Sequence, residues 1–258
     1  MITARKIIDL IEKSAPIGLA YPWDNSGFLC GGIDKEVRKI YITLDVDLYT
    51  VREAAALGAD MIVSHHPIMF GGIKKIEYGT PQGDVIRTLI KNDIALYASH
   101  TPLDCAAEGI NAALAARLGI SDAKPIESCD GFPGCGLGRI GRIEKTTLGE
   151  FAEKVKTALG TPFVRVCGEV DKPIIRAAVG GGACDDLIPQ ARAMGADVMV
   201  TADMKYHISK DSVESGIAVI DAGHYPTEAF AREMFADILH DCGAELVIST
   251  GQDVFKII

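Results

Sequence analysis

The sequence predicts an α/β protein made of two related α/β domains, each with a mostly parallel sheet flanked by helices. Three observations support this prediction. Short apolar runs typical of buried strands alternate along the chain with stretches whose apolar residues recur at helical spacing. Two segments of the second half resemble segments of the first half in the same order. The length of 258 residues suits two domains better than one.

The internal repeat rests on two short matches. Residues 57–64 (LGADMIVS) match residues 194–201 (MGADVMVT), and residues 94–100 (IALYASH) resemble residues 217–224 (IAVIDAGH) with one residue inserted. After both histidines the chain keeps the pattern H-x-P-x-(D/E). Each match is short, but two in the same order indicate duplicated halves.

In the first half, Thr3 is expected to cap a helix, and Gly58 and Gly119 are expected to end two later helices. The short apolar runs between the helices are typical of buried parallel strands. In chain order, the expected elements are a helix at 4–13, a strand at 39–45, a helix at 48–57, a strand at 60–64, a helix at 83–92, a strand at 94–99 and a helix at 108–118.

In the second half, Thr147 and Glu150 form the signature of a capping box, which predicts that a helix begins there. In chain order, the expected elements are a strand at 137–143, a helix at 147–159, strands at 162–167 and 174–180, a helix at 186–194, strands at 197–201 and 217–221, a helix at 227–240 and a strand at 246–249.

Residues 122–138 are rich in Gly, Pro and Ser and are expected to link the two domains. The first domain is therefore expected to span residues 1–124 and to be completed by the C-terminal helix and strand, 222–258. The second domain is expected at residues 125–221.

Composition and charge exclude several classes of protein. The net charge is −9, from 26 Lys and Arg against 35 Asp and Glu, which argues against a nucleic-acid partner. The longest stretch without a charged residue is Met61–Ile73, thirteen residues, and a membrane span needs about twenty apolar ones. The N-terminus lacks the apolar centre of a signal peptide, so we expect a cytoplasmic protein. The seven cysteines form no CxxC pair and are expected to be buried thiols.

Histidines follow the ends of predicted strands in both halves. His65, His66, His100, His207 and His224 all come just after such a strand. In open α/β sheets, ligands bind beyond the carboxyl ends of the strands. We therefore expect these residues to face a ligand site in the cleft between the two domains.

Five side chains in this group are candidate metal ligands: His65, His66, Asp104, His224 and Glu228. Neutral imidazole and carboxylate are the usual protein ligands of zinc, iron and manganese. One ion could not easily use all five and keep an open position, whereas two ions about 3.5–4 Å apart could. The sequence thus predicts two divalent ions per chain and leaves the metal, zinc, iron or manganese, unidentified.

Each candidate ligand also has a structural alternative. The pair His65–His66 could belong to a polar loop or cap a helix, and Asp104 could be a helix N-cap. Glu228 is expected in the first turn of a helix, where it could simply complement the helix dipole. As a ligand, Glu228 is assigned the bridge, because a carboxylate can bind two ions and an imidazole cannot.

Four other residues are candidates for catalysis or substrate binding. His100 and His207 are expected to carry protons, and Lys205 is expected to contact an anionic substrate. The alternative for Lys205 and His207 is a solvent-exposed loop. Asn25 is expected either to orient a substrate or to hold a turn.

Two glycine-rich segments resemble nucleotide-binding loops. Residues 131–141 precede a strand instead of opening a helix, so a domain-joining turn is the better interpretation. Residues 180–182 follow a strand and precede a helix, which suits a phosphate better, although two following aspartates would repel an anion. The roles of these segments, and of Asp24 and Asp203, stay open.

Five motifs, in one order, carry a resemblance to a known family. They are Trp23–Gly27 (WDNSG), Ser64–Pro67 (SHHP), Ser99–Asp104 (SHTPLD), Asp203–His207 (DMKYH) and Gly223–Glu228 (GHYPTE). With them, essentially the whole chain resembles the dinuclear metal-centre family of GTP cyclohydrolase I type 2 homologues, also called Nif-three-like proteins.

The resemblance implies more than the residue pattern does. It implies that the metal ligands are the same five residues, and that two-domain α/β subunits assemble into a homohexameric ring. The chain resembles the compact form of the family, without an inserted domain. One departure is Ala202, where the family often has glycine before the Asp-Met-Lys segment. It touches no proposed ligand.

The favoured interpretation is a metal-dependent hydrolase. The resemblance implies a small, nucleotide-like substrate and ring-opening chemistry of the GTP cyclohydrolase kind. The alternative is a non-enzymatic metal-binding protein that acts as a carrier, sensor or interaction scaffold. An open coordination position beside a substrate pocket would distinguish the enzyme from the carrier.

Overall fold

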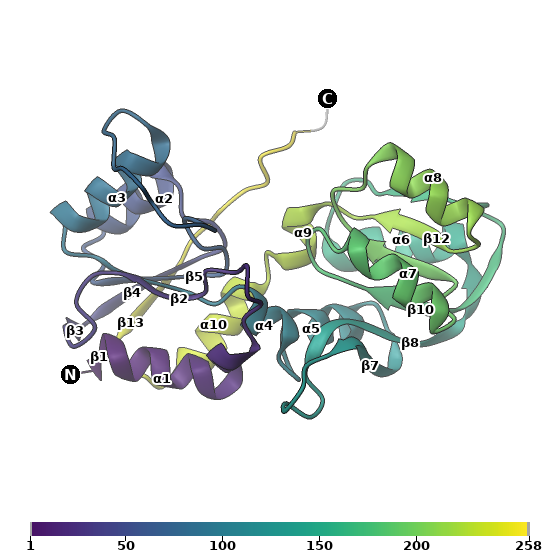
Figure 1. The fold of residues 1–258 in the computed structure, drawn as a ribbon, viewed down its shortest axis with the longest axis horizontal. Coiled ribbons are helices and arrows are strands. Elements are labelled where there is room, and N and C mark those ends of the chain that lie inside the picture. Colours follow the sequence, from purple (N-terminus) through teal and green to yellow (C-terminus); the bar gives the residue numbers. More distant parts are fainter. Residues whose placement is uncertain (1, 257–258) are drawn as a thin grey trace. The chain divides into compact units, whose positions relative to one another are not determined.

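The computed structural model describes residues 2–256 and divides the chain into two compact units. The first unit runs to Leu103 and takes up Phe230–Gly251, and the second runs from Asp104 to Ala229 and takes up the segment from Gln252. The sequence pattern placed these boundaries near residues 124 and 222. The segment after Leu103 joins the second unit because its helix packs against that unit's sheet. Figure 1 labels the elements of both units.

The first unit contains a five-stranded sheet in the order β13-β4-β5-β6-β2. The pairings β13–β4, β4–β5 and β5–β6 are parallel, and β2 runs antiparallel to β6 at the edge. The strands are β2 (Gly27–Cys30), β4 (Lys39–Thr43), β5 (Met61–Ser64), β6 (Ala95–Ala98) and β13 (Glu245–Ile248). A separate short pair joins β1 (Ile2–Thr3) to β3 (Glu36–Val37).

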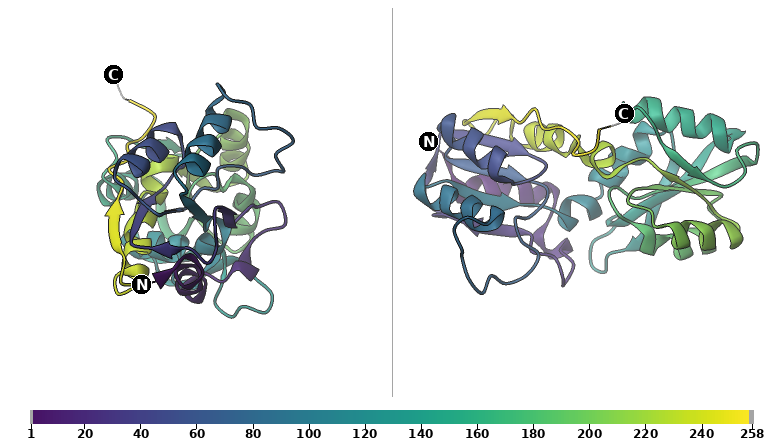
Figure 2. Two further views of the ribbon diagram at one scale, coloured as in Figure 1. Left: turned by 90° about the vertical axis from the view of Figure 1, so that its left-hand side faces the viewer. Right: turned by 90° about the horizontal axis from the view of Figure 1, so that it is seen from above.

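Helices cover both faces of this sheet (Figures 1 and 2). Tyr41, Ile62 and Leu96 point from β4, β5 and β6 into one apolar layer, which α2 and α3 complete. On the other face α1 packs against α10, and α10 packs against β4 and β13. The helices are α1 (Ala4–Ser14), α2 (Leu48–Ala56), α3 (Pro81–Lys91) and α10 (Ala231–Leu239).

Three helices, α2, α3 and α6 (Leu148–Leu159), begin with a side-chain cap. The predicted capping box is confirmed, since Glu150 N donates to Thr147 Oγ1 and Thr147 N donates to the Glu150 carboxylate. Asp47 forms a capping box with Thr50 at the start of α2, and at the start of α3 Thr80 Oγ1 accepts from Gly83 N without a return bond. The predicted Thr3 cap is wrong: Thr3 precedes α1, but its side chain makes no capping hydrogen bond and its backbone belongs to β1.

The second unit contains a six-stranded sheet in the order β7-β8-β10-β11-β12-β9. The α/β class is confirmed, but this sheet is mixed, since β10–β11 and β11–β12 pair in parallel and the other neighbouring strands pair antiparallel. The strands are β7 (Ser121–Ser128), β8 (Gly136–Thr147), β9 (Arg165–Cys167), β10 (Pro173–Val179), β11 (Val198–Thr201) and β12 (Ala218–Asp221).

The expectation that residues 122–138 form a linker is wrong. They form most of β7, the turn that follows it and the start of β8, which pairs with β7. The glycines in this hairpin permit close approach: a Cβ on Gly141 or Gly136 would lie closer than 3.0 Å to a backbone oxygen of β7. Glycine here marks strand contact, and the domain-joining turn is not observed.

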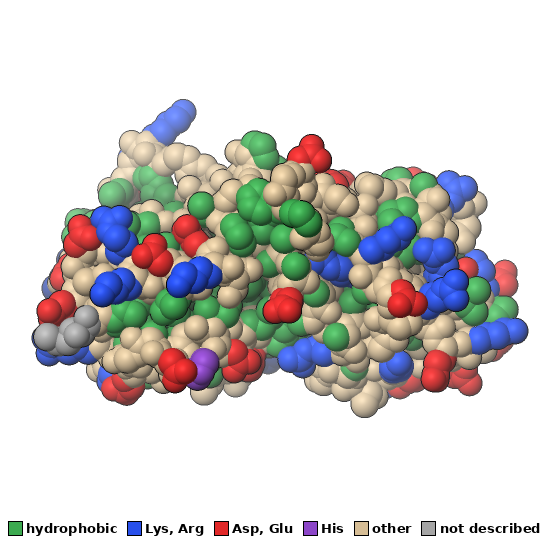
Figure 3. Space-filling model, turned by 90° about the horizontal axis from the view of Figure 1, so that it is seen from below, with side chains coloured by type: hydrophobic (Ala, Val, Ile, Leu, Met, Phe, Trp, Pro, Cys, Tyr) green, Lys and Arg blue, Asp and Glu red, His purple; other side chains and the backbone are tan. Residues whose placement is uncertain are grey.

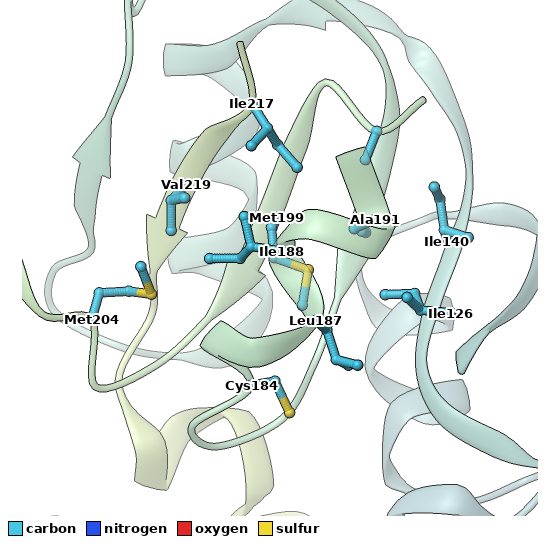
Figure 4. Close-up of a cluster of buried hydrophobic side chains, with 12 residues drawn as sticks. Ile126, Ile140, Cys184, Leu187, Ile188, Ala191, Met199, Met204, Ile217 and Val219 are labelled. Atoms are coloured by element: carbon cyan, nitrogen blue, oxygen red, sulfur yellow. The ribbon is translucent and has the colours of Figure 1, made fainter. Parts of the chain in front are cut away.

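The helices of the second unit pack against its sheet. α5 (Ile110–Arg117) and α6 (Leu148–Leu159) contact β8, and α8 (Tyr206–Glu214), which the sequence did not predict, contacts β12. Ile188 of α7 (Ile188–Ala193) packs in a buried cluster with Met199 and Val219 (Figure 4).

Two predicted helices are interrupted. The predicted helix at 186–194 begins as a 3₁₀ turn, Asp185–Leu187, before α7. The predicted helix at 227–240 is divided into α9 (His224–Glu228) and α10, with the division between the units falling after Ala229. α9 therefore belongs to the second unit and α10 to the first.

The matching sequence segments make matching hydrogen bonds in the two units. Asp60 Oδ2 accepts from the backbone amides of residues 38 and 39 at 2.8 and 3.1 Å. Asp197 Oδ2 accepts from the amides of residues 175 and 176 at 2.8 and 2.9 Å. In each unit this aspartate fixes the start of one central parallel strand against its neighbour.

No helix among residues 2–256 is both long and apolar enough to cross a membrane. On the face shown in Figure 3, Lys and Arg side chains lie among Asp and Glu side chains. The charge on this face is therefore mixed, as the composition suggests.

Candidate metal centre

Three histidines of the first unit lie together at the carboxyl ends of adjacent strands. His65 and His66 directly follow β5, and His100 follows β6 after one further residue. Because β5 and β6 pair in parallel, their carboxyl ends lie at the same edge of the sheet. The ring centroids are 4.8 Å apart for His65–His66, 5.2 Å for His65–His100 and 5.5 Å for His66–His100. One nitrogen from each ring lies within 4.8 Å of the others, so the three could hold a metal ion.

The orientation of the His65 ring is set by a backbone carbonyl. His65 is fully buried, and its Nδ1 lies 3.0 Å from the carbonyl oxygen of Ser99. A carbonyl can only accept a hydrogen bond, so Nδ1 carries the proton and donates it. The lone pair of the neutral ring is then on Nε2, an atom that can bind a cation.

His66 and His100 are held in the same manner by carboxylates. His66 Nδ1 lies 2.7 Å from Asp45 Oδ1, and His100 Nδ1 lies 3.0 Å from Asp24 Oδ1. A carboxylate that accepts from Nδ1–H fixes the ring and makes Nε2 a better electron donor. All three rings therefore have Nδ1 engaged, so the lone pair of each neutral ring lies on Nε2.

Asp24 is the centre of a buried hydrogen-bond network. Its Oδ2 accepts from Ser26 Oγ at 2.7 Å and from Thr101 Oγ1 at 2.6 Å, and its Oδ1 also accepts from Asn25 N at 2.7 Å. Burial alone would raise the pKa of Asp24, but the hydrogen bonds from His100, Thr101 and Ser26 outweigh it and hold the pKa of this carboxyl well below its usual range. Asp24 is thus an ionised anchor for His100.

Asn25, the other candidate in this segment, has a defined contact. Its Nδ2 donates to the carbonyl oxygen of Met69 at 2.9 Å. This bond joins the segment that carries Asp24 to the loop that follows His66. The contact fits the alternative in which Asn25 holds a turn.

The second unit brings together an imidazole and two carboxylates. α9 places His224 and Glu228 one helical turn apart, with His224 Nε2 3.0 Å from Glu228 Oε2. Glu228 is 3% exposed and Asp104 is 6% exposed, and one carboxylate oxygen of each lies within 4.8 Å of the other. Asp203 fixes the imidazole, since its Oδ2 lies 2.6 Å from His224 Nδ1.

Residues 180–182 pack against this group and do not cradle an anion. The amides of Gly180, Gly181 and Gly182 donate to Val200 O, Asn111 Oδ1 and Thr227 Oγ1, at 2.9, 2.9 and 3.0 Å. The phosphate-binding interpretation of this segment is therefore wrong for this conformation, because its amides are already used.

Gly182 leaves the space that the side chains of the candidate ligands His224 and Glu228 occupy. Its φ is +59°, and a Cβ there would lie 2.9 Å from His224 Nε2 and nearer still to Glu228 Oε1. Only glycine combines this left-handed backbone with so close an approach.

Cys184 lies beside the same carboxylates. Burial, followed by the negative charges of Asp104 and Glu228, raises the pKa of the Cys184 thiol well above its ordinary value. The thiol donates to Gly181 O at 3.2 Å. Cys184 is thus a neutral packing residue. The expectation of buried thiols is met by Cys105 and Cys184 and is wrong for the other five cysteines, which are partly exposed.

Lys205 and His207 lie on the surface at the start of α8. Lys205 occupies the N-cap position, His207 lies in the first turn, and both are exposed. Within residues 2–256 neither side chain takes part in a hydrogen bond or an ion pair; the His207 ring contacts Tyr206 at 5.2 Å between centroids. The structure brings His100 into a cluster of candidate ligands but does not do so for His207.

Three anchoring carboxylates were not predicted as functional from the sequence: Asp24, Asp45 and Asp203. Asp45 and Asp203 follow the strands β4 and β11, so the rule that ligands gather at carboxyl ends of strands could have indicated them. Asp24 follows no strand of a parallel pair, and no pattern in the sequence places it beside His100.

Comparisons with known proteins agree with the motif pattern. The family model described as Duf34/NIF3 (NGG1p interacting factor 3) matches residues 2–253. A relative from Clostridium perfringens, named "GTP cyclohydrolase 1 type 2 homolog", is 35% identical over 228 residues, covering 86% of this chain and 85% of the relative. A relative from Methanocaldococcus jannaschii with the same name is 34% identical over 238 residues, covering 92% and 94%.

Solved structures share the fold over almost the whole chain. A Bacillus cereus protein related to NIF3 matches with a TM-score of 0.90 at 26% identity, covering 100% of this chain and 99% of that one. The structure titled "Reduced HcgD from Methanocaldococcus jannaschii" matches with a TM-score of 0.84 at 32% identity, covering 97% and 98%.

Proposed function

Because the chain belongs to the Duf34/NIF3 family, we propose that it binds two divalent metal ions and uses them to hydrolyse a small, nucleotide-like substrate. The nucleotide class is supported by the name that curated relatives carry, GTP cyclohydrolase 1 type 2 homolog. The proposed ligands are His65, His66, Asp104, His224 and Glu228.

The observation that carries the proposal is the shared tautomer of the histidine cluster. His65, His66 and His100 all use Nδ1 to contact an acceptor, at 3.0, 2.7 and 3.0 Å. Histidine ligands of metals typically hold their second nitrogen in this way. A cluster that served packing alone would have no reason to bring one nitrogen from each of three rings within 4.8 Å of the others.

The acidic residues supply the charge that a cation needs. Asp104 and Glu228 are both buried, and oxygens of the two carboxylates lie within 4.8 Å. Two carboxylates so close and so poorly hydrated repel each other, and either a proton or a cation must offset that repulsion. A carboxylate can bind two ions at once, so we assign Glu228 as the bridge.

When bound, two divalent ions lower the pKa of a water and polarise the group that it attacks. His65 and His66 hold their places through Ser99 and Asp45. His100 is assigned to proton transfer at Nε2, because Asp24 fixes its ring through Nδ1. Lys205 and His207 are proposed as an anion contact and a second proton carrier. Asn25 is proposed to hold the loop after His66 in place through its bond to Met69 O.

The resemblance to the family also supports a homohexameric ring and a cytoplasmic location as proposals. Light scattering on the purified protein should give six subunits per particle. A stable mass of one or two subunits at micromolar concentration would contradict the ring.

The test of the hydrolase combines metal loading with substrate screening. The protein is purified without chelators, loaded with zinc, iron(II) or manganese in turn, and screened against phosphoesters and nucleotides. The double variant His65→Ala, His66→Ala should lose metal and all turnover. His240→Ala is the matched control, since His240 is exposed and its ring contacts Asp237 O and Asp241. A protein that keeps its metal but turns over no substrate would support the carrier or scaffold instead.

A further inference from the structure

Two large aromatic rings stand exposed beside the histidine cluster of the first unit. Trp23 is 57% exposed and Phe70 is 54% exposed. Their ring centroids lie 5.8 and 5.5 Å from the ring of His100, and 6.4 Å from each other. Trp23 is the one tryptophan of the whole sequence. Neither ring is needed for the core, which buries its own aromatic residues.

Both rings are held in place by the backbone around them. Trp23 directly precedes Asp24, whose side chain is fully buried and accepts hydrogen bonds from Ser26 and Thr101. Phe70 follows Met69, whose carbonyl accepts from Asn25 Nδ2 at 2.9 Å. The network that orients His100 therefore also positions these exposed rings. Their exposure is a feature of an ordered site and not of a loose chain end.

The Trp23 and Phe70 rings are not parallel, and together they form an open aromatic corner that cannot enclose a flat ring on both faces. The Trp23 and Phe70 rings are inclined at 42° to each other. A flat ring cannot lie face to face with both, but it can stack on one and meet the other edge-on, an arrangement that aromatic groups favour. Stacking of this kind accepts any planar heteroaromatic ring, because every such ring has a π face.

A cavity in the same unit adjoins this corner. Its volume is about 760 Å³, within the range of small-molecule sites, and Phe70 lines it together with Lys74, Lys75 and the start of α3. Lys75 forms an ion pair with Glu77 at 2.7 Å, so these two charges offset each other. Lys74 then gives the cavity lining a net positive charge. An aromatic wall joined to a basic cavity matches a molecule with a flat ring at one end and an anion at the other.

We propose that Trp23 and Phe70 bind the base of a nucleotide by stacking and that the cavity at Lys74 binds its phosphate. The inference rests on the proposed function, since it names the residues that recognise the substrate beside the metal centre. It makes Trp23 and Phe70 the determinants of specificity for a planar ring. Lys74 would neutralise the phosphate as a point charge.

Because Trp23 is the chain's one tryptophan, its fluorescence reports directly on this corner. The protein is titrated with guanosine 5′-monophosphate, guanosine and ribose 5-phosphate, with inner-filter correction, and calorimetry gives the dissociation constants. The monophosphate and guanosine should quench the fluorescence, and ribose 5-phosphate should not. Equal responses to ribose 5-phosphate and guanosine 5′-monophosphate would overturn the stacking site.

Variants separate the two parts of the site. Phe70→Ala should weaken guanosine 5′-monophosphate about 5- to 150-fold, the range expected for one lost stacking contact. Trp23→Ala, followed by calorimetry, should do the same, and Trp23→Phe should restore part of the affinity. Tyr49→Ala is the control, because Tyr49 is an exposed ring on α2 that does not line the cavity. Unchanged affinity in both alanine variants would overturn the proposal.

Lys74→Ala should weaken the monophosphate but not guanosine, whereas Lys91→Ala at the far end of α3 should change neither. Equal weakening of both ligands by Lys74→Ala would contradict the phosphate assignment. The metal content of every sample is measured in parallel. If the protein binds metal but shows no preference for ligands with a planar ring, this inference alone is overturned. If the protein binds such ligands but takes up no metal, the inference is supported and the metal-dependent hydrolase is refuted.

Discussion

Substituting Gly182 by alanine tests whether His224 and Glu228 are metal ligands, because the added methyl group would meet both. At a φ of +59° the backbone of an alanine is strained even where its side chain has enough space. Gly58 offers a matched control, since its φ is +69° and a Cβ there would meet nothing within 4 Å. The two alanine variants share the backbone strain, and only Gly182→Ala adds the collision.

The structure sets the size of the effect. The strain of a left-handed alanine costs about 1–2 kcal/mol of stability in both variants. At Gly182 the new Cβ would lie 2.9 Å from His224 Nε2 and nearer still to Glu228 Oε1. Ordinary contact begins at 3.4 Å, so the His224 side chain must move by about 0.5 Å and the Glu228 side chain by more. These atoms are side-chain ends and can move cheaply. Metal sites tolerate only about 0.2 Å in ligand distance, so metal affinity should fall at least tenfold.

Two measurements separate strain from collision. Urea denaturation of both variants should show similar losses of unfolding free energy. Competition with a chromophoric chelator should show weaker metal binding in Gly182→Ala and wild-type affinity in Gly58→Ala. If Gly182→Ala bound metal as tightly as Gly58→Ala, the side chains beside it would not be ligands.

Three further predictions concern the ligands, their anchor and the surface loop. Glu228→Gln should remove both ions and Asp104→Asn at most one, as metal analysis of the two variants will show; equal losses would refute the bridge. Asp24→Asn should lower the free energy of unfolding by about 2 kcal/mol near neutral pH. The Asp24 carboxylate stabilises the fold above its unfolded pKa of about 4, and this stabilisation is lost as the pH falls below that value. In urea titrations, the unfolding free energy of the variant should therefore fall less steeply with decreasing pH than that of the wild type. The double variant Lys205→Ala, His207→Ala should keep its metal and lose turnover about a hundredfold; full activity would make the loop a surface turn.

The strand positions were predictable because buried parallel strands have a strong signature. β5, β6, β11 and β12 are short apolar runs buried along their whole length. Their carboxyl ends fix where histidines can meet, so the clustering of His65 and His66 with His100 follows from sequence and topology together.

The β7–β8 hairpin was missed because its residues have no apolar period. The first four residues of β7 are exposed, and glycine and proline in the segment resemble breakers. In the structure the glycines of β8 allow the two backbones to approach closely. Glycine occurs both in loops and where two strands lie unusually close together, and only the position of the partner strand distinguishes the two cases.

The anchors of the histidines could not be inferred, because they depend on contacts remote in sequence. Asp24 and His100 are 76 residues apart, and His66 and Asp45 are 21 apart. Nothing local marks an aspartate as the partner of a particular ring. The same limit applies to the exposed pair Trp23 and Phe70, which only the fold brings together.

The central claim is the proposal that this chain binds two divalent ions. Native mass spectrometry of protein purified without chelators counts the ions on each chain directly. The account predicts two ions per chain in the wild type and a loss of both in Glu228→Gln. One ion or none in the fully loaded wild type, or a full complement of two in Glu228→Gln, would contradict it.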